Sequence, residues 1–291
     1  MEASDISLPT INDDTLDQED WPILGQGAGG ITRKVEWKNN NDTAPVTLVA
    51  VKTFVGTLTS DGSPQDERAI SVVASSTSTT TTIATSSPTT TTTTTSTAAA
   101  STPSNNKKSK LMNDNKNTSS NCLISLLGQT PKGALIMEYL DGYEALAGPP
   151  SMESCSRDVY SRTSLSTTQA KKIVTGLLRV LTNLHAKGIC HGDFYGHNIL
   201  IHEGATEEEF RVKLSDFGAA FFYDVTAPYA KWIEKIELRA FGVLVEELQS
   251  LLLVGIDDDE KEVNLLFAKL VKACQDDKIT SFEDLGHLII F

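Results

Sequence analysis

The spacing of hydrophobic residues changes along the chain, from a two-residue period in the first half to a helical period in the second. Ile31, Val35 and Trp37 fall on one side of an extended chain, and polar residues take the alternate positions, which is typical of a half-buried strand. Residues 46–54 are rich in β-branched side chains and are bounded by polar loops, so a second strand is expected there. A glycine-rich turn at 25–30 precedes the first of these strands.

A helix is expected after these strands, over residues 62–74. Ser63 is a suitable N-cap and Pro64 suits the first helical position, and Asp66 follows three residues after the cap. Glu67 shares one face of this helix with the apolar residues that follow it. The first half therefore predicts strands around one helix.

Residues 75–120 are almost wholly Thr, Ser, Ala, Asn and Lys. Such a stretch has too little apolar surface to offset the entropy lost on ordering, so we expect a disordered insertion. It is either a modified tether or an inert expansion, and composition favours the inert expansion. Order resumes with two apolar runs, 121–128 and 134–140, separated by a turn-like stretch, which predicts a hairpin.

The second half predicts helices. Ser166 with Gln169 opens an amphipathic helix that leads to His191. Residues 231–253 are apolar on several faces, which indicates a central helix. An acidic turn and the helical stretch 263–274 follow. The order of elements predicts an α+β protein with two lobes, an antiparallel sheet with one helix and then a mainly helical lobe.

Composition narrows the class of protein. The net charge of −13 argues against a general binder of nucleic acid or anionic membranes. The 4 cysteines have no paired spacing, which argues against zinc and disulfide frameworks. The N-terminus is acidic and polar, unlike a signal peptide, and the most apolar run, 248–256, is too short to span a bilayer. We therefore expect a soluble, cytoplasmic protein.

Two short stretches of the second half carry candidate chemistry. In His191–Leu200, HGDFYGHNIL, four residues separate Asp193 from Asn198, and SDFG places Asp216 in a turn. One carboxylate to accept a hydroxyl proton, with an amide oxygen and a second carboxylate for magnesium, is what phosphoryl transfer needs. The two stretches resemble the catalytic loop and the metal-binding turn of the protein kinase family. The resemblance implies Asp193 as the catalytic base and Asn198 and Asp216 as Mg²⁺ ligands.

The first half resembles the nucleotide-binding part of the same family. GQGAGG at 25–30 fits G-x-G-x-x-G and lies between two strands, as a kinase glycine loop over ATP does. The resemblance makes Lys52 the cation on the α- and β-phosphates and Glu67 the carboxylate that pairs with it. Asp66, next to Glu67, is the other carboxylate on this helix that could pair with Lys52. It also places an adenine-binding hinge at 137–140. The nucleotide-binding residues implied in this way are Gly25, Gly27, Gly30, Ala50, Lys52, Glu67, Glu138 and Leu140.

Several positions depart from the family pattern. Gly192 replaces the Arg that usually receives an activation-loop phosphate, and the segment after Gly218 is short, so control by loop phosphorylation is not expected. Tyr195 replaces the Lys that usually contacts the γ-phosphate, and His197 is no obvious substitute. Glu237 stands where the central helix usually has an anchoring Asp.

The resulting hypothesis is an ATP- and Mg²⁺-dependent protein kinase that acts on Ser or Thr hydroxyls of an unidentified protein. Its expected organisation is an acidic flexible tail (1–17), an N-lobe (18–140) with the insertion, and a C-lobe (141–291) with a shortened activation segment and substrate platform. A nucleotide-binding pseudokinase is an alternative, because Gly192 and Tyr195 leave activity open. A small-molecule kinase resembling aminoglycoside or choline phosphotransferases is another, since those enzymes share the HGD-x-x-x-x-N pattern.

Overall fold

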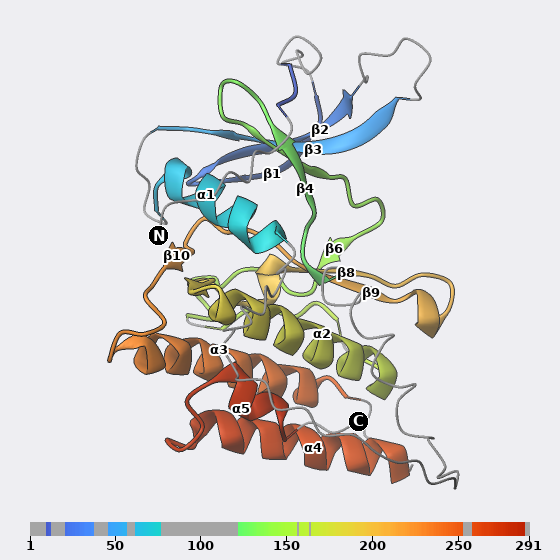
Figure 1. Cartoon of the computed structure of the whole chain (residues 1–291). Coiled ribbons are helices and arrows are strands. Elements are labelled where there is room, and N and C mark those ends of the chain that lie inside the picture. Colours follow the sequence, from blue (N-terminus) through green and yellow to red (C-terminus); the bar gives the residue numbers. More distant parts are fainter. Residues whose placement is uncertain are drawn as a thin grey trace, which may run out of the picture.

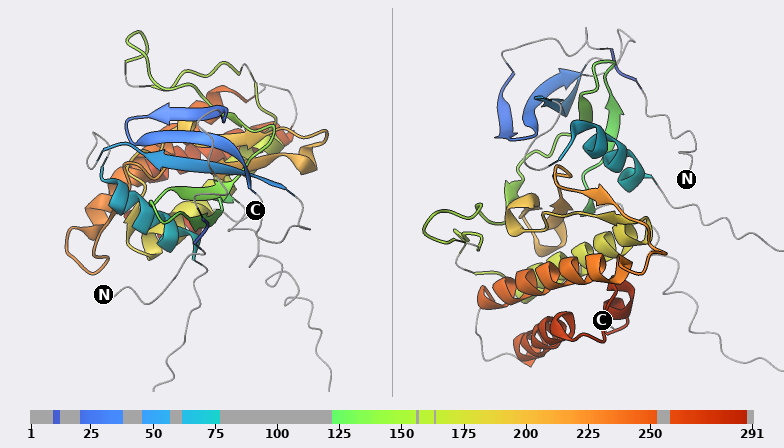
Figure 2. Two further views of the ribbon diagram at one scale, coloured as in Figure 1. Left: turned by 90° about the horizontal axis from the view of Figure 1, so that it is seen from above. Right: turned by 90° about the vertical axis from the view of Figure 1, so that its left-hand side faces the viewer.

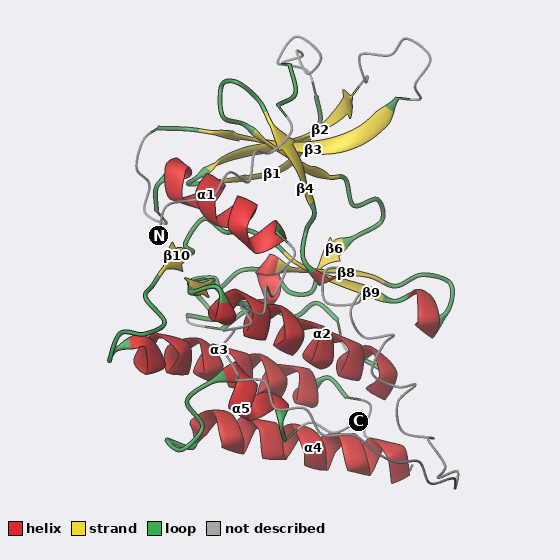
Figure 3. Ribbon diagram, in the orientation of Figure 1, coloured by secondary structure: helices red, strands yellow, loops and turns green. Residues whose placement is uncertain are grey.

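The computed structural model describes residues 10–12, 21–37, 46–56, 62–76, 122–155, 157–162, 164–252 and 258–288. They form two lobes that lie one above the other in Figures 1 and 3. One is built mainly of strands (the strand lobe) and the other mainly of helices (the helical lobe). The predicted α+β, two-lobed fold is thus confirmed.

The strand lobe is a five-stranded antiparallel sheet in the order β1-β2-β3-β5-β4. Its strands are β1 (Ile23–Gly27), β2 (Gly30–Trp37), β3 (Thr47–Phe54), β4 (Leu126–Gln129) and β5 (Leu135–Glu138). Both predicted strands and the predicted hairpin are present. One face of the sheet buries an apolar cluster that includes Val35, Val49 and Ile136. Because these side chains are buried, β3 is a rigid support for Lys52, which follows Val51 in the strand.

Helix α1 (Pro64–Ser75) lies between the sheet and the helical lobe in Figure 1, and the right-hand view of Figure 2 draws it beside the strands and above the helices of that lobe. Ser63 caps it as predicted, because its side chain accepts from the backbone N–H of Asp66 at 3.1 Å. At the other end, the ammonium group of Lys187 donates to three backbone carbonyls of residues 73–76. A cation at a helix C-terminus is favourable, and this one joins α1 to the helical lobe.

Four helices form most of the helical lobe. They are α2 (Thr167–Ala186), α3 (Ala230–Ser250), α4 (Asp258–Gln275) and α5 (Phe282–Gly286). Ser166 and Gln169 form the predicted capping box of α2. Helix α4 already begins at Asp258, so part of the stretch expected as an acidic turn is helical. The reason is electrostatic, since acidic side chains in a first turn favour the positive end of the helix dipole.

Short strands and turns between the lobes carry the polar residues of interest. β6 (Glu144–Ala145), β8 (Ile199–His202) and β9 (Arg211–Leu214) form one small sheet, and β7 (Ile189–Cys190) pairs with β10 (Phe221–Phe222). Two 3₁₀ turns, η4 (Gly196–Asn198) and η5 (Glu207–Glu209), flank β8. The two-residue strands were not predicted, because so few residues carry no periodic signal.

Most of the predicted tail, and most of the predicted insertion at 75–120, lie outside the described residues. Within the first of these segments, Thr10 bridges to Gln129 and Ile11 is buried against the sheet. Residues 10–12 therefore pack on β4. Within the described parts of the chain, no helix combines the length and apolar character needed to cross a membrane.

Candidate functional site

Lys52 stands at the junction of the two lobes, on β3. Its ammonium nitrogen lies 2.5 Å from Glu67 Oε1 of α1 and 3.0 Å from Asp216 Oδ1 of the helical lobe. Burial alone would lower the pKa of Lys52, but the carboxylates of Asp216 and Glu67 outweigh it and raise that pKa above 10.5. The lysine is therefore charged, and it holds the strand, the helix and the turn together.

Asp216 follows β9 in the turn SDFG. Its backbone has φ of 60°, a left-handed conformation that is uncommon outside glycine. The carboxylate accepts a hydrogen bond from the Gly218 N–H at 3.0 Å. Burial would raise the pKa of Asp216, but Lys52 and this hydrogen bond lower it. Backbone strain of this kind collects at functional sites, and here it aims an ionised carboxylate at Lys52.

Asp193 and Asn198 lie on the loop between β7 and β8. The amide nitrogen of Asn198 donates to Asp193 Oδ2 at 2.7 Å and to the Asp193 carbonyl at 2.8 Å. The backbone carbonyl of Asn198 in turn accepts hydrogen bonds from the backbone N–H and the side-chain hydroxyl of Ser215, at 2.9 and 2.8 Å. Since Ser215 precedes Asp216, this loop and the SDFG turn form one hydrogen-bonded unit. The structure thus ties the loop with Asp193 and Asn198 to the turn with Asp216, which Lys52 reaches from the sheet.

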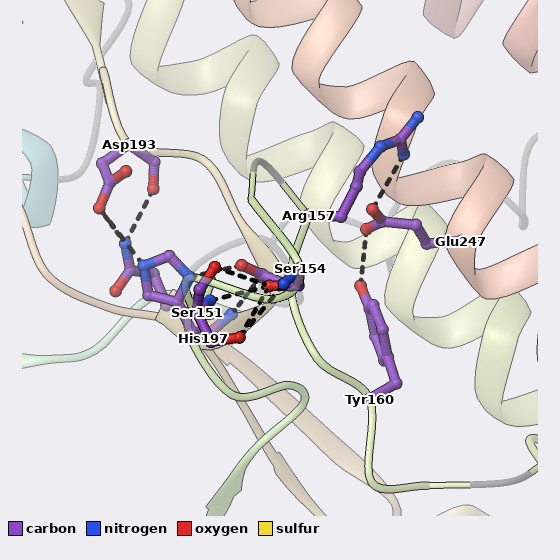
Figure 4. Close-up of polar contacts among 9 residues, drawn as sticks. Ser151, Ser154, Arg157, Tyr160, Asp193, His197 and Glu247 are labelled. Atoms are coloured by element: carbon purple, nitrogen blue, oxygen red, sulfur yellow. Dashed lines mark hydrogen bonds and ion pairs between the residues drawn. The ribbon is translucent and has the colours of Figure 1, made fainter.

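His197 and Asp158 form part of the same loop region, and sequence reasoning missed their association. Asp158 accepts from the backbone N–H and from the Nδ1–H of His197, both at 2.9 Å. On its other side, His197 Nε2 lies 3.6 Å from Asp193 Oδ2; Figure 4 draws Asp193 and His197 close together. The interaction with Asp193, reinforced by Asp158, raises the pKa of His197 to about 9.

The sequence suggested no role for His197, and the structure places its imidazole between two carboxylates. The nearby imidazole of His197 in turn lowers the pKa of Asp193, so that carboxylate is ionised at neutral pH. The sequence held no signal for this, because Asp158 lies in an irregular stretch 39 residues before His197.

Glu237 of α3 holds the backbone that precedes Asp193. Its carboxylate accepts from the N–H groups of His191 and Gly192, at 3.1 and 2.9 Å. His185 Nε2 lies 2.6 Å from the same carboxylate, and His185 Nδ1 lies 2.8 Å from the Tyr223 hydroxyl. Burial would raise the pKa of Glu237, but His185 and the backbone N–H groups lower it. The residue acts as the anchor expected at this position.

A cleft of about 480 Å³ opens between the lobes. Of the residues singled out in the sequence, it is lined by Gly25, Ala50, Lys52, Glu67, Glu138, Leu140 and Asp216. Asp193 and Asn198 are not among its lining residues. The Glu138 side chain does not point freely into the cleft, because it accepts from the Ser125 N–H at 2.8 Å and from Lys213 Nζ at 2.6 Å. Lys213, which sequence reasoning missed, thus fixes the end of β5.

The glycines of the turn between β1 and β2 differ in what they require. A Cβ at Gly25 or Gly27 would meet no atom within 4 Å, so these positions border open space. At Gly30, φ is +155° and a Cβ would lie 2.2 Å from the Thr53 carbonyl oxygen. Gly30 is thus needed by the sheet itself, whereas Gly25 and Gly27 leave backbone accessible to a bound molecule.

Comparison with known families agrees with this geometry. Residues 106–237 match the model of the protein kinase domain. This match, over somewhat less than half of the chain, supports membership of the protein kinase superfamily. No curated protein matches the chain. The matched residues include the loop with Asp193 and Asn198 and the SDFG turn; the glycine turn and Lys52 precede them.

A lysine holds the backbone that follows α4. Here Lys235 of α3 donates to the carbonyls of Asp276 and Ile279, at 2.9 Å for the latter. These hydrogen bonds give the two backbone carbonyls after α4 a donor.

Proposed function

We propose that this kinase domain transfers the γ-phosphoryl group of ATP, in the presence of Mg²⁺, to Ser or Thr hydroxyls of a protein. The observation that carries the proposal is Lys52, whose ammonium group joins Glu67 at 2.5 Å to Asp216 at 3.0 Å across the cleft. A charged lysine between a sheet and a metal-binding turn is the arrangement that phosphoryl transfer from ATP uses.

The nucleotide would occupy the cleft between the lobes. Ala50, Glu138 and Leu140 line this cleft, and we assign them to the flat, apolar adenine ring. The turn with Gly25, Gly27 and Gly30 would cover the phosphates, because backbone N–H groups can approach an anion where side chains are missing. Lys52 would then neutralise the α- and β-phosphates.

Asn198 and Asp216 fit Mg²⁺ as a donor set. The nitrogen of the Asn198 amide is used by Asp193, which leaves the amide oxygen as the atom for a cation. Mg²⁺ is typically held by one or two carboxylates together with phosphate oxygens and water, so one carboxylate and one amide oxygen suffice. When bound, the ion would neutralise the charge that develops on the phosphates.

Asp193 would act as the base. The acceptor hydroxyl donates to its carboxylate while the oxygen forms a bond to the γ-phosphorus and the bond to the β-phosphate oxygen breaks. The hydroxyl proton passes to Asp193, and ADP leaves. Since the pKa of Asp193 lies below its ordinary value, this group serves mainly by orienting the hydroxyl, which suits a reaction that depends on positioning.

The test is phosphate transfer from labelled ATP and Mg²⁺ to Ser, Thr and Tyr peptides, comparing the wild type with Asp193→Asn. Asp141→Asn, an exposed change near the same cleft, is the matched control. We expect transfer to Ser or Thr peptides by the wild type and the control, and a loss of at least 100-fold in Asp193→Asn, by analogy with the loss of a catalytic base. Transfer to amino-alcohols or sugars but to no peptide would identify a small-molecule kinase instead.

A nucleotide-binding scaffold is the second candidate, favoured by Tyr195, which leaves a 40% exposed ring where the family usually has a cation. An absence of turnover with every acceptor, together with a melting temperature raised by Mg-ATP, would support the scaffold. Stabilisation by a ligand that binds only the folded state is expected in either case, so turnover decides between the two.

A further inference from the structure

The apolar face of helix α1 packs against the helical lobe. Ile70 and Ala74 are buried in the same apolar cluster as residues of α2, α3 and α4. The apolar cluster of the sheet, by contrast, contains no residue of α1. A polar contact, the pair of Lys52 with Glu67, reaches α1 from the sheet. Glu67 is therefore presented to the sheet by a helix that belongs, by its packing, to the helical lobe.

Lys187 binds the C-terminal end of α1. Its ammonium nitrogen lies 3.0 Å from the carbonyl oxygens of Val73 and Ala74 and 2.6 Å from that of Ser76. An ammonium group has three N–H donors and no acceptor, so these carbonyls use all of them. The last turn of a helix leaves carbonyls without a partner inside the helix, and the last turn of α1 has no basic residue of its own. Lys187, 111 residues beyond Ser76, supplies the cation.

The backbone of Lys187 is itself held in place. The residue is the C-cap of α2, and its N–H donates to the Leu184 carbonyl at 2.9 Å. The next residue, Gly188, has φ of +68°, and its carbonyl accepts from the Tyr223 N–H at 2.8 Å. β7 and the loop with Asp193 follow directly. Lys187 thus joins the end of α1 to the base of the catalytic loop.

We propose that Lys187 is a positioning residue of this kinase domain: by holding the C-terminal end of α1 on the helical lobe, it keeps Glu67 against Lys52. The inference rests on the proposed binding of ATP, for which Glu67 holds the ammonium group of Lys52. Apolar packing is non-directional, so the buried face of α1 does not by itself fix how far the helix slides or turns. Three hydrogen bonds to the end of the helix fix both, and the helix passes the constraint to Glu67 in its first turn.

The first experiment measures the affinity of the full chain for a non-hydrolysable Mg-ATP analogue by calorimetry. Lys187→Met keeps an apolar side chain and removes the three donors, and we expect the affinity to fall roughly fivefold, within the usual coupling between linked residues. Lys187→Arg, whose guanidinium also donates to carbonyls, should recover most of the loss. Lys172→Met is the matched control, because Lys172 donates to a carbonyl of η5 and not of α1. Equal affinity in Lys187→Met and the wild type overturns the inference.

A double-mutant cycle tests whether Lys187 acts through Glu67. If it does, the chain with both Lys187→Met and Glu67→Gln binds the analogue no more weakly than Glu67→Gln alone, since the residue on which Lys187 acts has already lost its charge. Independent effects would multiply instead. A double variant whose loss of affinity equals the product of the two single losses therefore overturns the positioning role and leaves Lys187 a structural residue.

Hydrogen exchange of the nucleotide-free protein separates this inference from the proposed function. Lys187→Met should speed the exchange of backbone amides in α1 and leave those of α2 unchanged, because only α1 loses its anchor. Lys187→Gln is a second variant should Lys187→Met not fold, and the same pattern is expected. Unchanged exchange in α1 overturns the inference. A wild type that binds no nucleotide, together with faster exchange of α1 in the variant, would contradict the proposed function and support the anchoring of α1 by Lys187.

Discussion

Gly192 and Ala219 lie in direct backbone contact. With φ of +77° at Gly192, a Cβ there would stand 2.3 Å from the Ala219 carbonyl oxygen. The segment after the SDFG turn thus packs on the catalytic loop at the position where the family usually has an Arg. The same segment pairs through β10 with β7, and its Tyr223 hydroxyl lies 2.8 Å from His185 Nδ1. These contacts hold the segment without a phosphate group.

Restoring the family residue should therefore damage this protein. Gly192→Arg places a side chain on a left-handed backbone, which costs about 1–3 kcal/mol for the conformation alone, and it also displaces Ala219. We expect a lower free energy of unfolding in urea and a lower rate of phosphate transfer. Gly286→Ala in α5, where a Cβ meets no atom within 4 Å, is the control and should remain close to the wild type. Wild-type stability in Gly192→Arg would refute the steric account.

Glu67 should matter to nucleotide binding, and its neighbour Asp66 should not. Glu67 is buried against Lys52, whereas Asp66 is exposed and interacts with the N-cap Ser63. Glu67→Gln removes the charge that holds the ammonium group, so KM for ATP should rise by about tenfold or more. A tenfold change corresponds to about 1.4 kcal/mol of binding free energy. Asp66→Asn should leave KM unchanged. An equal effect of the two substitutions would show that Lys52 does not depend on Glu67.

The anchor Glu237 should make folding stability depend on acid. Its folded-state pKa lies below the ordinary value of 4.5. The stabilisation is therefore complete above that value and is lost as the pH falls through the lower, folded-state pKa. We expect the melting temperature of Glu237→Gln to be lower than that of the wild type at pH 7. Between about pH 5 and pH 3, where a carboxyl group with a pKa below 4.5 takes up its proton, the melting temperature of the variant should fall less than that of the wild type. Glu283→Gln, an exposed change on α5, should follow the wild type; parallel curves for all three proteins would contradict the prediction.

The capping box of α2 should contribute measurably to stability. Ser166 accepts from the Gln169 N–H at 3.2 Å, and the Gln169 side chain accepts from the Ser166 N–H at 3.1 Å. Replacement of such a cap by alanine typically costs about 1 kcal/mol, so Ser166→Ala should lower the unfolding midpoint in urea without changing the slope. Ser250→Ala, near the C-terminus of α3, tests whether any serine near a helix end has the same effect. A midpoint unchanged in Ser166→Ala would mean that packing alone holds this end of α2.

Local signals were enough for the elements and for the order of the motifs. Ser63, Pro64 and Asp66 mark the start of α1, and Ser166 with Gln169 marks the start of α2, because a helix cap is made by residues within one turn of each other. Alternation of side chains likewise marks β2 and β3. The residue types of Lys52, Asp193, Asn198 and Asp216 could be recognised in the same way, since each lies in a short motif.

Contacts between distant segments could not be read from those patterns. Asp158 meets His197 across 39 residues, Lys213 meets Glu138 across 75, and Gly192 meets Ala219 through the path of a loop. None of these pairs shares a helix face or a strand register, so no periodicity relates its members. They form because folding brings separate segments of the chain side by side, and a buried polar group requires a partner from whichever segment lies beside it.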